Sequence, residues 1–305
     1  MFTMKLLSMI ELYRTDCVYR QLSKGSIENY IKHDTYLAKY LEETFGVTEL
    51  EEVTMPQIKS YVQLKQQAGR KPSYINDMIK AYKTFFRYCV EEEYLEKDPT
   101  KKLKNVKQPK IIIRTFTEVE VLKMINYCNG KDFVSIRDKI MLALLFDTGM
   151  RLNELVSLRE DQIHEDYIIV WGKGSKERVV PLSPYNARLL MKYRIAKDYY
   201  FEGRNTKPKA LVFVSYRGNK LNANSITKCM KNVAKAVGVH PDVRVSPHTC
   251  RHTFAQLQLK NGLDIYTLSR LLGHENITIT QRYLQGIRND EVLEMAKKTG
   301  VLQHL

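Results

Sequence analysis

The 305-residue sequence lacks the long apolar runs and the nucleotide-binding loops that mark several large protein classes. No hydrophobic stretch approaches the ~18–20 residues that a membrane-spanning helix needs. The N-terminal segment reaches Glu11 and Asp16 too early for a secretory signal peptide, so we expect neither a signal peptide nor a membrane anchor. Neither GxxxxGK[ST] nor GxGxxG occurs, and we therefore expect no nucleotide cofactor.

Cysteine is scarce and irregularly spaced. The chain has five cysteines, an odd number, and no CxxC pair. This pattern argues against a disulfide framework and against a zinc site, and it predicts a protein of the reducing cytoplasm. No Asp/Glu cluster with metal-ligand spacing accompanies the polar motifs described below, so we expect no bound metal.

Basic residues exceed acidic residues by a wide margin. The chain has 49 Lys and Arg against 34 Asp and Glu, a formal net charge of +15. Residues 1–108 contain 18 basic and 15 acidic residues, so residues 109–305 contain 31 and 19 and carry +12 of the net charge. A surplus of this size indicates a polyanionic partner, and its distribution assigns most of that binding to the second part of the chain.

The first part of the chain is predicted to be a bundle of four helices. Apolar residues recur at helical spacing over residues 4–22, 26–46, 55–69 and 73–93. Ser26 is the expected cap of the second helix and Gly46 its end, while Thr54 and Gln57 form a capping box before the third. The aromatic residues on these helices are predicted to be core.

Residues 96–113 are predicted to be a linker because they contain two prolines and six lysines without a helical pattern. The chain is therefore expected to form two domains. Residues 1–108 would be a helical domain with the basic linker at its end, and residues 109–305 a second domain with a C-terminal tail.

The second part combines helices with a β-hairpin. The segments at 166–171 and 177–182 are β-rich, and the turn between them places Lys173 at its tip. A further short strand is expected at 211–215. Helices are expected at about 117–129, 133–149, 152–158, 184–200, 225–237, 248–261, 264–272, 276–285 and 289–298. The predicted fold class is mainly α with a small antiparallel β-sheet.

Six polar residues in this second part form an ordered series. They are Arg151 in TGMRLNEL, Lys173 at the hairpin tip, His248 and Arg251 three residues apart, His274 in LLGH, and Tyr283 nine residues later. His248 and Arg251 project from one helix face because they are at positions i and i+3. We assign no role to His240, His252 or His304.

The series resembles the tyrosine recombinase (phage integrase) family, and most of all its arm-less, Xer-like branch. The motifs TGMRLNEL, GKGSKERVVPL, SPHTCRHTFA, LLGHENITIT and RYL carry the resemblance, which extends over nearly the whole chain. It implies a SAM-like core-binding bundle in residues 26–95, an α+β catalytic domain in residues 110–300, and no separate arm-DNA domain before the bundle.

The resemblance also implies a reaction. The enzyme would be a site-specific recombinase that cleaves and rejoins duplex DNA without metal or ATP. Tyr283 would be the nucleophile and would form a covalent 3′-phosphotyrosine intermediate. Arg151 and Arg251 would hold the phosphate oxygens, because guanidinium groups are planar and always charged, and His274 would add a third hydrogen bond.

The remaining roles concern protons and support. Lys173 would be the general acid for the leaving 5′-oxygen, with Lys176 as the alternative lysine on the same hairpin. His248 would accept or position the tyrosine proton. Glu154, one turn after Arg151, is expected to buttress the site rather than to react.

The family implies a homotetramer acting on two DNA sites, with a second recombinase or an accessory protein left open. Two other functions compete with this prediction. One is a type IB topoisomerase-like enzyme that uses the same cleavage chemistry as a monomer. The other is a catalytically silent DNA-binding relative, and the intact series of six residues argues against it.

Overall fold

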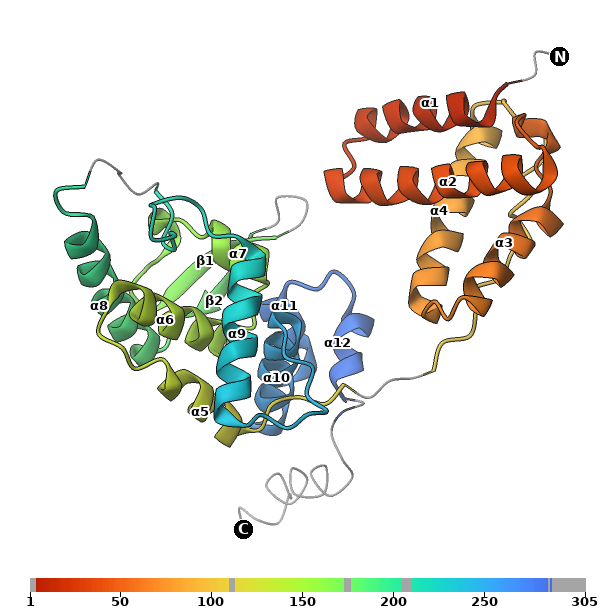
Figure 1. The fold of residues 1–305 in the computed structure, drawn as a ribbon. Coiled ribbons are helices and arrows are strands. Elements are labelled where there is room, and N and C mark those ends of the chain that lie inside the picture. The colour runs from red at the N-terminus through yellow and green to blue at the C-terminus, as the bar shows by residue number, and fades with distance from the viewer. Residues whose placement is uncertain (1–3, 110–112, 173–176, 205–209, 285, 287–305) are drawn as a thin grey trace, which may run out of the picture. The chain divides into compact units, whose positions relative to one another are not determined.

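The computed structural model describes residues 4–109, 113–172, 177–204, 210–284 and 286. The chain divides into two compact units, residues 1–110 and 111–305 (Figure 1). The boundary expected after residue 108 lies beside this division. The roles that the sequence assigns to the two parts remain predictions.

The first unit is a bundle of helices. Its helices are α1 (Leu6–Tyr19), α2 (Lys24–Phe45), α3 (Met55–Gln67) and α4 (Pro72–Glu91). Their apolar stripes meet in one core that contains Tyr13, Tyr82 and Phe85, all fully buried. The rings of Tyr13 and Phe85 pack edge to face at 5.6 Å. Most aromatic residues of the apolar stripes are core, as predicted, but Phe45 at the end of α2 is 43% exposed, so the prediction is wrong there.

The cap of α2 differs from the prediction. Ser23, not Ser26, is the N-cap, and its hydroxyl accepts a hydrogen bond from the backbone N–H of Ser26 at 3.3 Å. Serine is a preferred N-cap residue, and the sequence offers one at position 23 and another at position 26. Gly46 ends α2 in the left-handed conformation, as expected.

The predicted linker is wrong over its first half, because residues 96–106 pack on the bundle. Thr100 and Leu103 are buried, and Leu103 joins the core of the first unit. The side chain of Asn76 on α4 donates to the carbonyl of Val106 at 2.9 Å and accepts from its N–H at 2.8 Å. No periodic pattern arises here because Leu103 and Val106 are isolated apolar residues among lysines, although both pack on the bundle core.

The second unit is mixed. Its helices are α5 (Glu118–Tyr127), α6 (Phe133–Thr148), α7 (Leu152–Ser157), α8 (Pro184–Phe201), α9 (Ala223–Val237), α10 (Pro247–Lys260), α11 (Ile265–Leu272) and α12 (Ile277–Leu284). Strands β1 (Tyr167–Trp171) and β2 (Glu177–Pro181) pair antiparallel, with Tyr167 opposite Pro181. The predicted fold class, mainly α with a small antiparallel sheet, is confirmed.

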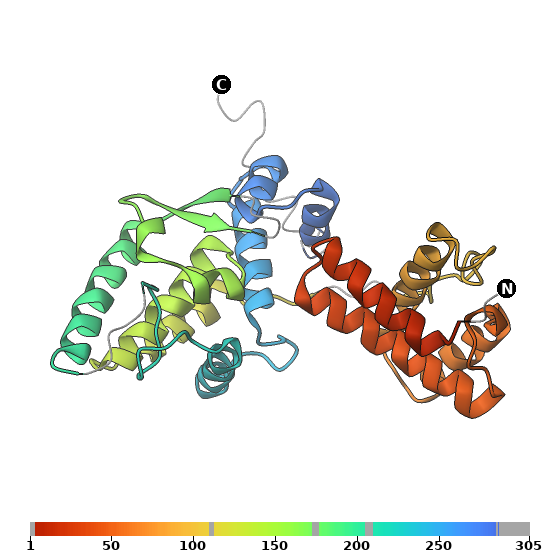
Figure 2. The same ribbon diagram turned by 90° about the horizontal axis from the view of Figure 1, so that it is seen from above.

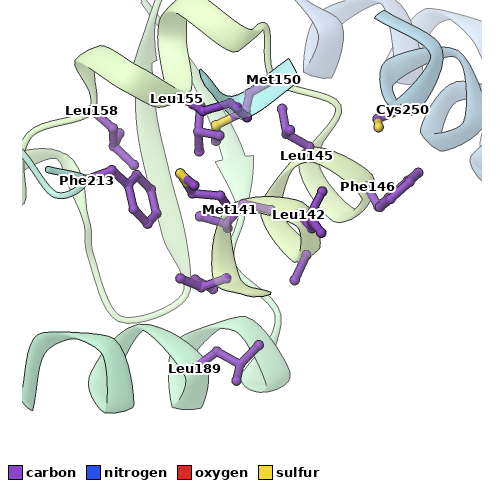
Figure 3. Packing of buried hydrophobic residues seen from close by; sticks show 14 of the residues in the cluster. Met141, Leu142, Leu145, Phe146, Met150, Leu155, Leu158, Leu189, Phe213 and Cys250 are labelled. Carbon is purple, nitrogen blue, oxygen red and sulfur yellow. The ribbon is translucent and has the colours of Figure 1, made fainter. Parts of the chain in front are cut away.

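Helix α6 lies at the centre of the second core (Figure 3). Met141, Leu142 and Leu145 are buried at different positions around it, which fits the fully buried helix expected there. The strand expected at 211–215 is wrong, because Leu211 and Val214 make only isolated bridges. That apolar run instead fills the core, where Phe213 is completely buried.

Helices α10, α11 and α12 pack against one another, and α10 also contacts α6 (Figures 1 and 2). Two glycines end the helices that point into this junction. Gly149 ends α6 at φ +61° and Gly273 ends α11 at φ +65°. A Cβ on Gly149 would lie 2.4 Å from the Phe254 ring of α10, so both the backbone conformation and the space require glycine.

We expect Gly149→Ala to destabilise the second unit more than Gly238→Ala. Both glycines have positive φ, which costs an alanine about 1–2 kcal/mol. Only Gly149 is crowded, and overpacking adds about 1–3 kcal/mol. Urea unfolding followed by the fluorescence of Trp171, the single tryptophan, reports on this unit. Equal losses in the two variants would contradict the steric argument.

Candidate active site

The structure brings five of the six predicted residues together. Arg151 stands just before α7, His248 and Arg251 lie on α10, His274 follows α11, and Tyr283 lies on α12. Arg251 bonds His274, and the His274 ring stacks on the Tyr283 ring. Lys173 and the alternative Lys176 lie outside the described residues.

Arg251 is the buried centre of the group, with 4% of its surface exposed. Its guanidinium donates to the carbonyl of Gly149 at 2.8 Å and to that of Leu272 at 2.5 Å. These carbonyls belong to the ends of α6 and α11 and have no partner within their own helices. Burial, and then the charge of Arg151, lowers the pKa of Arg251 to about 10.

Glu154 is a buried carboxylate shared by two arginines. It accepts from the backbone N–H of Arg151 at 2.6 Å and from the Arg151 guanidinium at 2.9 Å. Both terminal nitrogens of Arg178 bond it, at 2.9 and 2.7 Å. Burial would raise the pKa of Glu154, but the Arg178 and Arg151 bonds outweigh it and lower the pKa. This arrangement supports the expected role as a buttress.

Arg178 is a site residue that sequence reasoning missed. It lies on β2, is nearly buried, and donates from Nε to the carbonyl of Leu271 at 2.8 Å. A Cβ on Gly273 would lie 2.8 Å from its side chain, so the glycine after α11 makes room for it. The available signal was an arginine within a strand, opposite the buried Val170.

His274 is held at both ring nitrogens. Nε2 lies 2.9 Å from Arg251 and Nδ1 lies 2.8 Å from the hydroxyl of Thr280. An arginine has only donors, so Nε2 accepts and Nδ1–H donates to Thr280. Burial, then Arg251 and Arg151, lowers the pKa of His274 to about 4, which makes the ring neutral at pH 7.

Tyr283 is 5% exposed and lies between two imidazoles. The His274 ring is nearly parallel to it at 6.0 Å, and the His252 ring meets it edge to face at 4.8 Å. His252 had no role in the sequence analysis, because its contact depends on where α12 packs. His248 is exposed, and burial of part of its ring, with Arg251 and Arg151, lowers its pKa.

The described site is rich in positive charge. Arg151, Arg178 and Arg251 are close enough for their charges to act on His274, and Glu154 is the acid that bonds two of them. Such a cluster of guanidinium groups suits an oxyanion ligand. Within the described ranges, no three His, Cys, Asp or Glu side chains are grouped to hold a metal, and no helix could cross a membrane.

Residues 114–289 match the sequence model of the Phage integrase family. The chain belongs to this family of tyrosine recombinases. It is 30% identical over 274 residues to tyrosine recombinase XerD of Listeria monocytogenes, covering 87% of this chain and 89% of the relative. It is 32% identical over 258 residues to tyrosine recombinase XerD of Lacticaseibacillus casei, covering 83% and 86%. The predicted Xer-like resemblance is confirmed.

Solved structures share the fold of this recombinase. The XerH recombinase bound to a palindromic difH substrate has a TM-score of 0.75 at 19% identity, covering 97% of this chain and 84% of that one. A lambda integrase tetramer bound to a Holliday junction has a TM-score of 0.68 at 16% identity, covering 95% and 78%. The family match and the XerD relatives confirm the predicted function at the level of the enzyme class: the chain is a site-specific recombinase that breaks and rejoins DNA strands.

We expect Glu154→Gln to destabilise the second unit of the recombinase in a pH-dependent way. The free energy of unfolding should fall by about 3–5 kcal/mol at pH 7, because the guanidinium groups of Arg151 and Arg178 lose a buried counter-charge. The folded pKa of Glu154 is depressed, so its contribution is present above the unfolded value and is lost as pH falls through the folded value.

Urea unfolding followed by Trp171 fluorescence from pH 7 down to about pH 2 measures how the difference in unfolding free energy from the wild type changes, because the folded pKa of Glu154 lies below its ordinary value. Asp161→Asn is the matched control, because that carboxylate pairs with Arg159 at the exposed surface. Its loss should change the free energy of unfolding by less than about 1 kcal/mol. A difference for Glu154→Gln that stays constant as the pH falls would contradict a charged, arginine-bound Glu154.

Proposed function

We propose that this recombinase cleaves duplex DNA by attack of the Tyr283 oxygen on a backbone phosphate. The bond from that oxygen to phosphorus forms while the bond to the 5′-oxygen breaks, which leaves a 3′-phosphotyrosine and a 5′-hydroxyl. Attack by a different 5′-hydroxyl reverses the step and completes strand exchange. The bond energy is conserved in the covalent link, so the reaction needs no ATP.

The observation that carries this proposal is the position of Tyr283 beside a cluster of arginines, of which Arg251 is buried and Arg151 partly exposed. The Tyr283 ring stacks on the His274 ring at 6.0 Å, and Nε2 of His274 lies 2.9 Å from the Arg251 guanidinium, so the tyrosine and the arginine meet on the same histidine. Burial and the charge of Arg151 lower the pKa of Arg251. A phosphate bound by Arg151 and Arg251 would relieve their repulsion. Donors arranged in advance in this way contribute roughly 3–4 kcal/mol each to transition-state stabilisation in other enzymes.

Arg151 and Arg251 would bind the phosphate differently. The Arg151 side chain is 38% exposed and bonds Glu154, which leaves its other N–H groups for a ligand. Arg251 already bonds two carbonyls and His274, so it is fixed in place before DNA binds. We propose that Arg251 sets the position of the phosphate and that Arg151 closes on it from the solvent side.

His274 would need to change its hydrogen bonds to serve as a phosphate donor. Its Nε2 accepts from Arg251, and only the other tautomer carries the Nε2 hydrogen that a phosphate oxygen requires. The Thr280 hydroxyl is compatible with both tautomers, since it can accept from Nδ1 or donate to it. We propose that phosphate binding selects the second tautomer.

Proton transfer is assigned to His248 and to the hairpin lysine. His248 is exposed on α10, and its lowered pKa favours the neutral form that accepts the phenolic proton. Lys173 remains the proposed general acid for the 5′-oxygen, with Lys176 as the alternative, and both lie outside the described residues. Cleavage in this scheme uses no metal and no cofactor.

We propose further that the two units clamp duplex DNA and that four protomers act on two sites. The net charge of +12 on residues 109–305 and the lambda integrase tetramer on a Holliday junction support this assembly. All five cysteines are free thiols, which supports a cytoplasmic location. Integration or excision of a mobile element and resolution of joined DNA use the same steps, and a partner recombinase is compatible with each.

We expect Tyr283→Phe to abolish covalent attachment to DNA. The substitution removes the attacking oxygen and keeps the ring that packs on His252 and His274. The measurement is a denaturing gel of protein with a nicked suicide duplex that carries a recombination site, in a buffer containing EDTA.

Tyr266→Phe is the control, because this tyrosine of α11 is 63% exposed and has no proposed role. It should form the adduct at the wild-type rate. An adduct that persists in Tyr283→Phe would show that another residue is the nucleophile. Joint molecules formed from two sites by the wild type would separate recombination from relaxation by a topoisomerase-like enzyme.

A further inference from the structure

Helix α10 presents different side chains to different parts of the site. Consecutive residues of a helix point about 100° apart. Arg251 points to the ends of α6 and α11, where it bonds two carbonyls. His252, the next residue, faces α12 and meets the ring of Tyr283 edge to face at 4.8 Å with an interplanar angle of 73°.

The two imidazoles confine the Tyr283 ring from two directions. His274 stacks on it with an interplanar angle of 20°, and His252 supplies the perpendicular contact. Offset-stacked and edge-to-face pairs are the favoured arrangements of such rings. Together they restrict rotation of the Tyr283 side chain, which otherwise has two free torsions.

The same face of α10 also holds the backbone of Tyr283. Gln256, one turn after His252, donates to the carbonyl of Tyr283 at 3.4 Å. Its own oxygen accepts from the hydroxyl of Thr115 at 2.6 Å, which fixes the amide. Position 283 is therefore held at its carbonyl by Gln256 and at its ring by His252.

His252 is suited to a packing role rather than to proton transfer. Burial, and then the neighbouring His248 and Arg251, lowers its pKa to about 4, so the ring is neutral at pH 7. A neutral ring adds no further charge beside Arg251. It presents a compact aromatic edge to the tyrosine ring.

We propose that His252 is a positioning residue that orients the Tyr283 ring for in-line attack on the phosphate. The inference rests on the proposed role of Tyr283 as the nucleophile. Attack requires the reacting atoms to be about 3–3.5 Å apart and aligned, and a displacement of about 1 Å costs on the order of 100-fold in rate. Loss of one wall of the ring's pocket should therefore slow cleavage without weakening DNA binding.

The test compares His252→Ala with His252→Phe in the full chain. Adduct formation is measured at saturating nicked suicide duplex, and binding is measured separately. We expect His252→Ala to reduce the cleavage rate about 10- to 100-fold at unchanged Kd, and His252→Phe, which keeps an aromatic edge, to stay within about 3-fold of wild type. His240→Ala, an exposed histidine outside the site, is the control and should match wild type.

A substrate with a 5′-bridging sulfur at the scissile phosphate identifies the step that is affected. Sulfur leaves without a general acid, so this substrate rescues a defect in leaving-group protonation, with Lys173→Ala as the comparison. It should not rescue His252→Ala. Rescue of His252→Ala, an unchanged rate in His252→Ala, or equal losses in His252→Ala and His252→Phe would each overturn the proposal.

Tyr283→Phe, assayed alongside, distinguishes a failure of the proposed nucleophile from a failure of the proposed role of His252. An adduct in Tyr283→Phe would refute the proposed nucleophile and with it the role of His252. No adduct in Tyr283→Phe together with full activity in His252→Ala would refute the role of His252 alone.

Discussion

The site depends on one constraint: several guanidinium groups must be held together in a mostly buried space. Glu154 balances Arg151 and Arg178 through four hydrogen bonds, while Arg251 bonds helix-end carbonyls instead of a carboxylate. Removing charges from water is costly unless they are paired and hydrogen-bonded, and here the pairing is incomplete. A bound scissile phosphate would neutralise the positive charge that remains.

The ends of the helices provide the means of holding these groups. Carbonyls that a helix leaves without partners at its C-terminus attract cations. Leu271 and Leu272 of α11 receive Arg178 and Arg251, and Gly149 after α6 receives Arg251 as well. The same bonds that satisfy these helix ends therefore fix the arginines in position. Helix α10 then extends the arrangement, with Arg251 facing these helix ends and His252 facing Tyr283, the proposed nucleophile.

Most of the helices and much of the site could be predicted because their signals are local. Gly149 and Gly273 mark helix ends, and the ordered series from Arg151 to Tyr283 identified the family. Leu103, Arg178 and His252 escaped prediction because their partners are distant in the sequence. Arg178 meets Glu154 and Leu271 only after β2 and α11 have packed, and the contact of His252 depends on the place of α12. No periodicity within one segment encodes such contacts.

Mapping the covalent adduct shows most directly whether Tyr283 is the residue that becomes joined to DNA. Wild-type protein trapped on a nicked suicide duplex is digested with nuclease and protease, and the modified peptide is sequenced by mass spectrometry. We expect a nucleotide joined through its 3′-phosphate to Tyr283 and to none of the other tyrosines among the 19 in the chain. A nucleotide on a different residue would contradict this expectation.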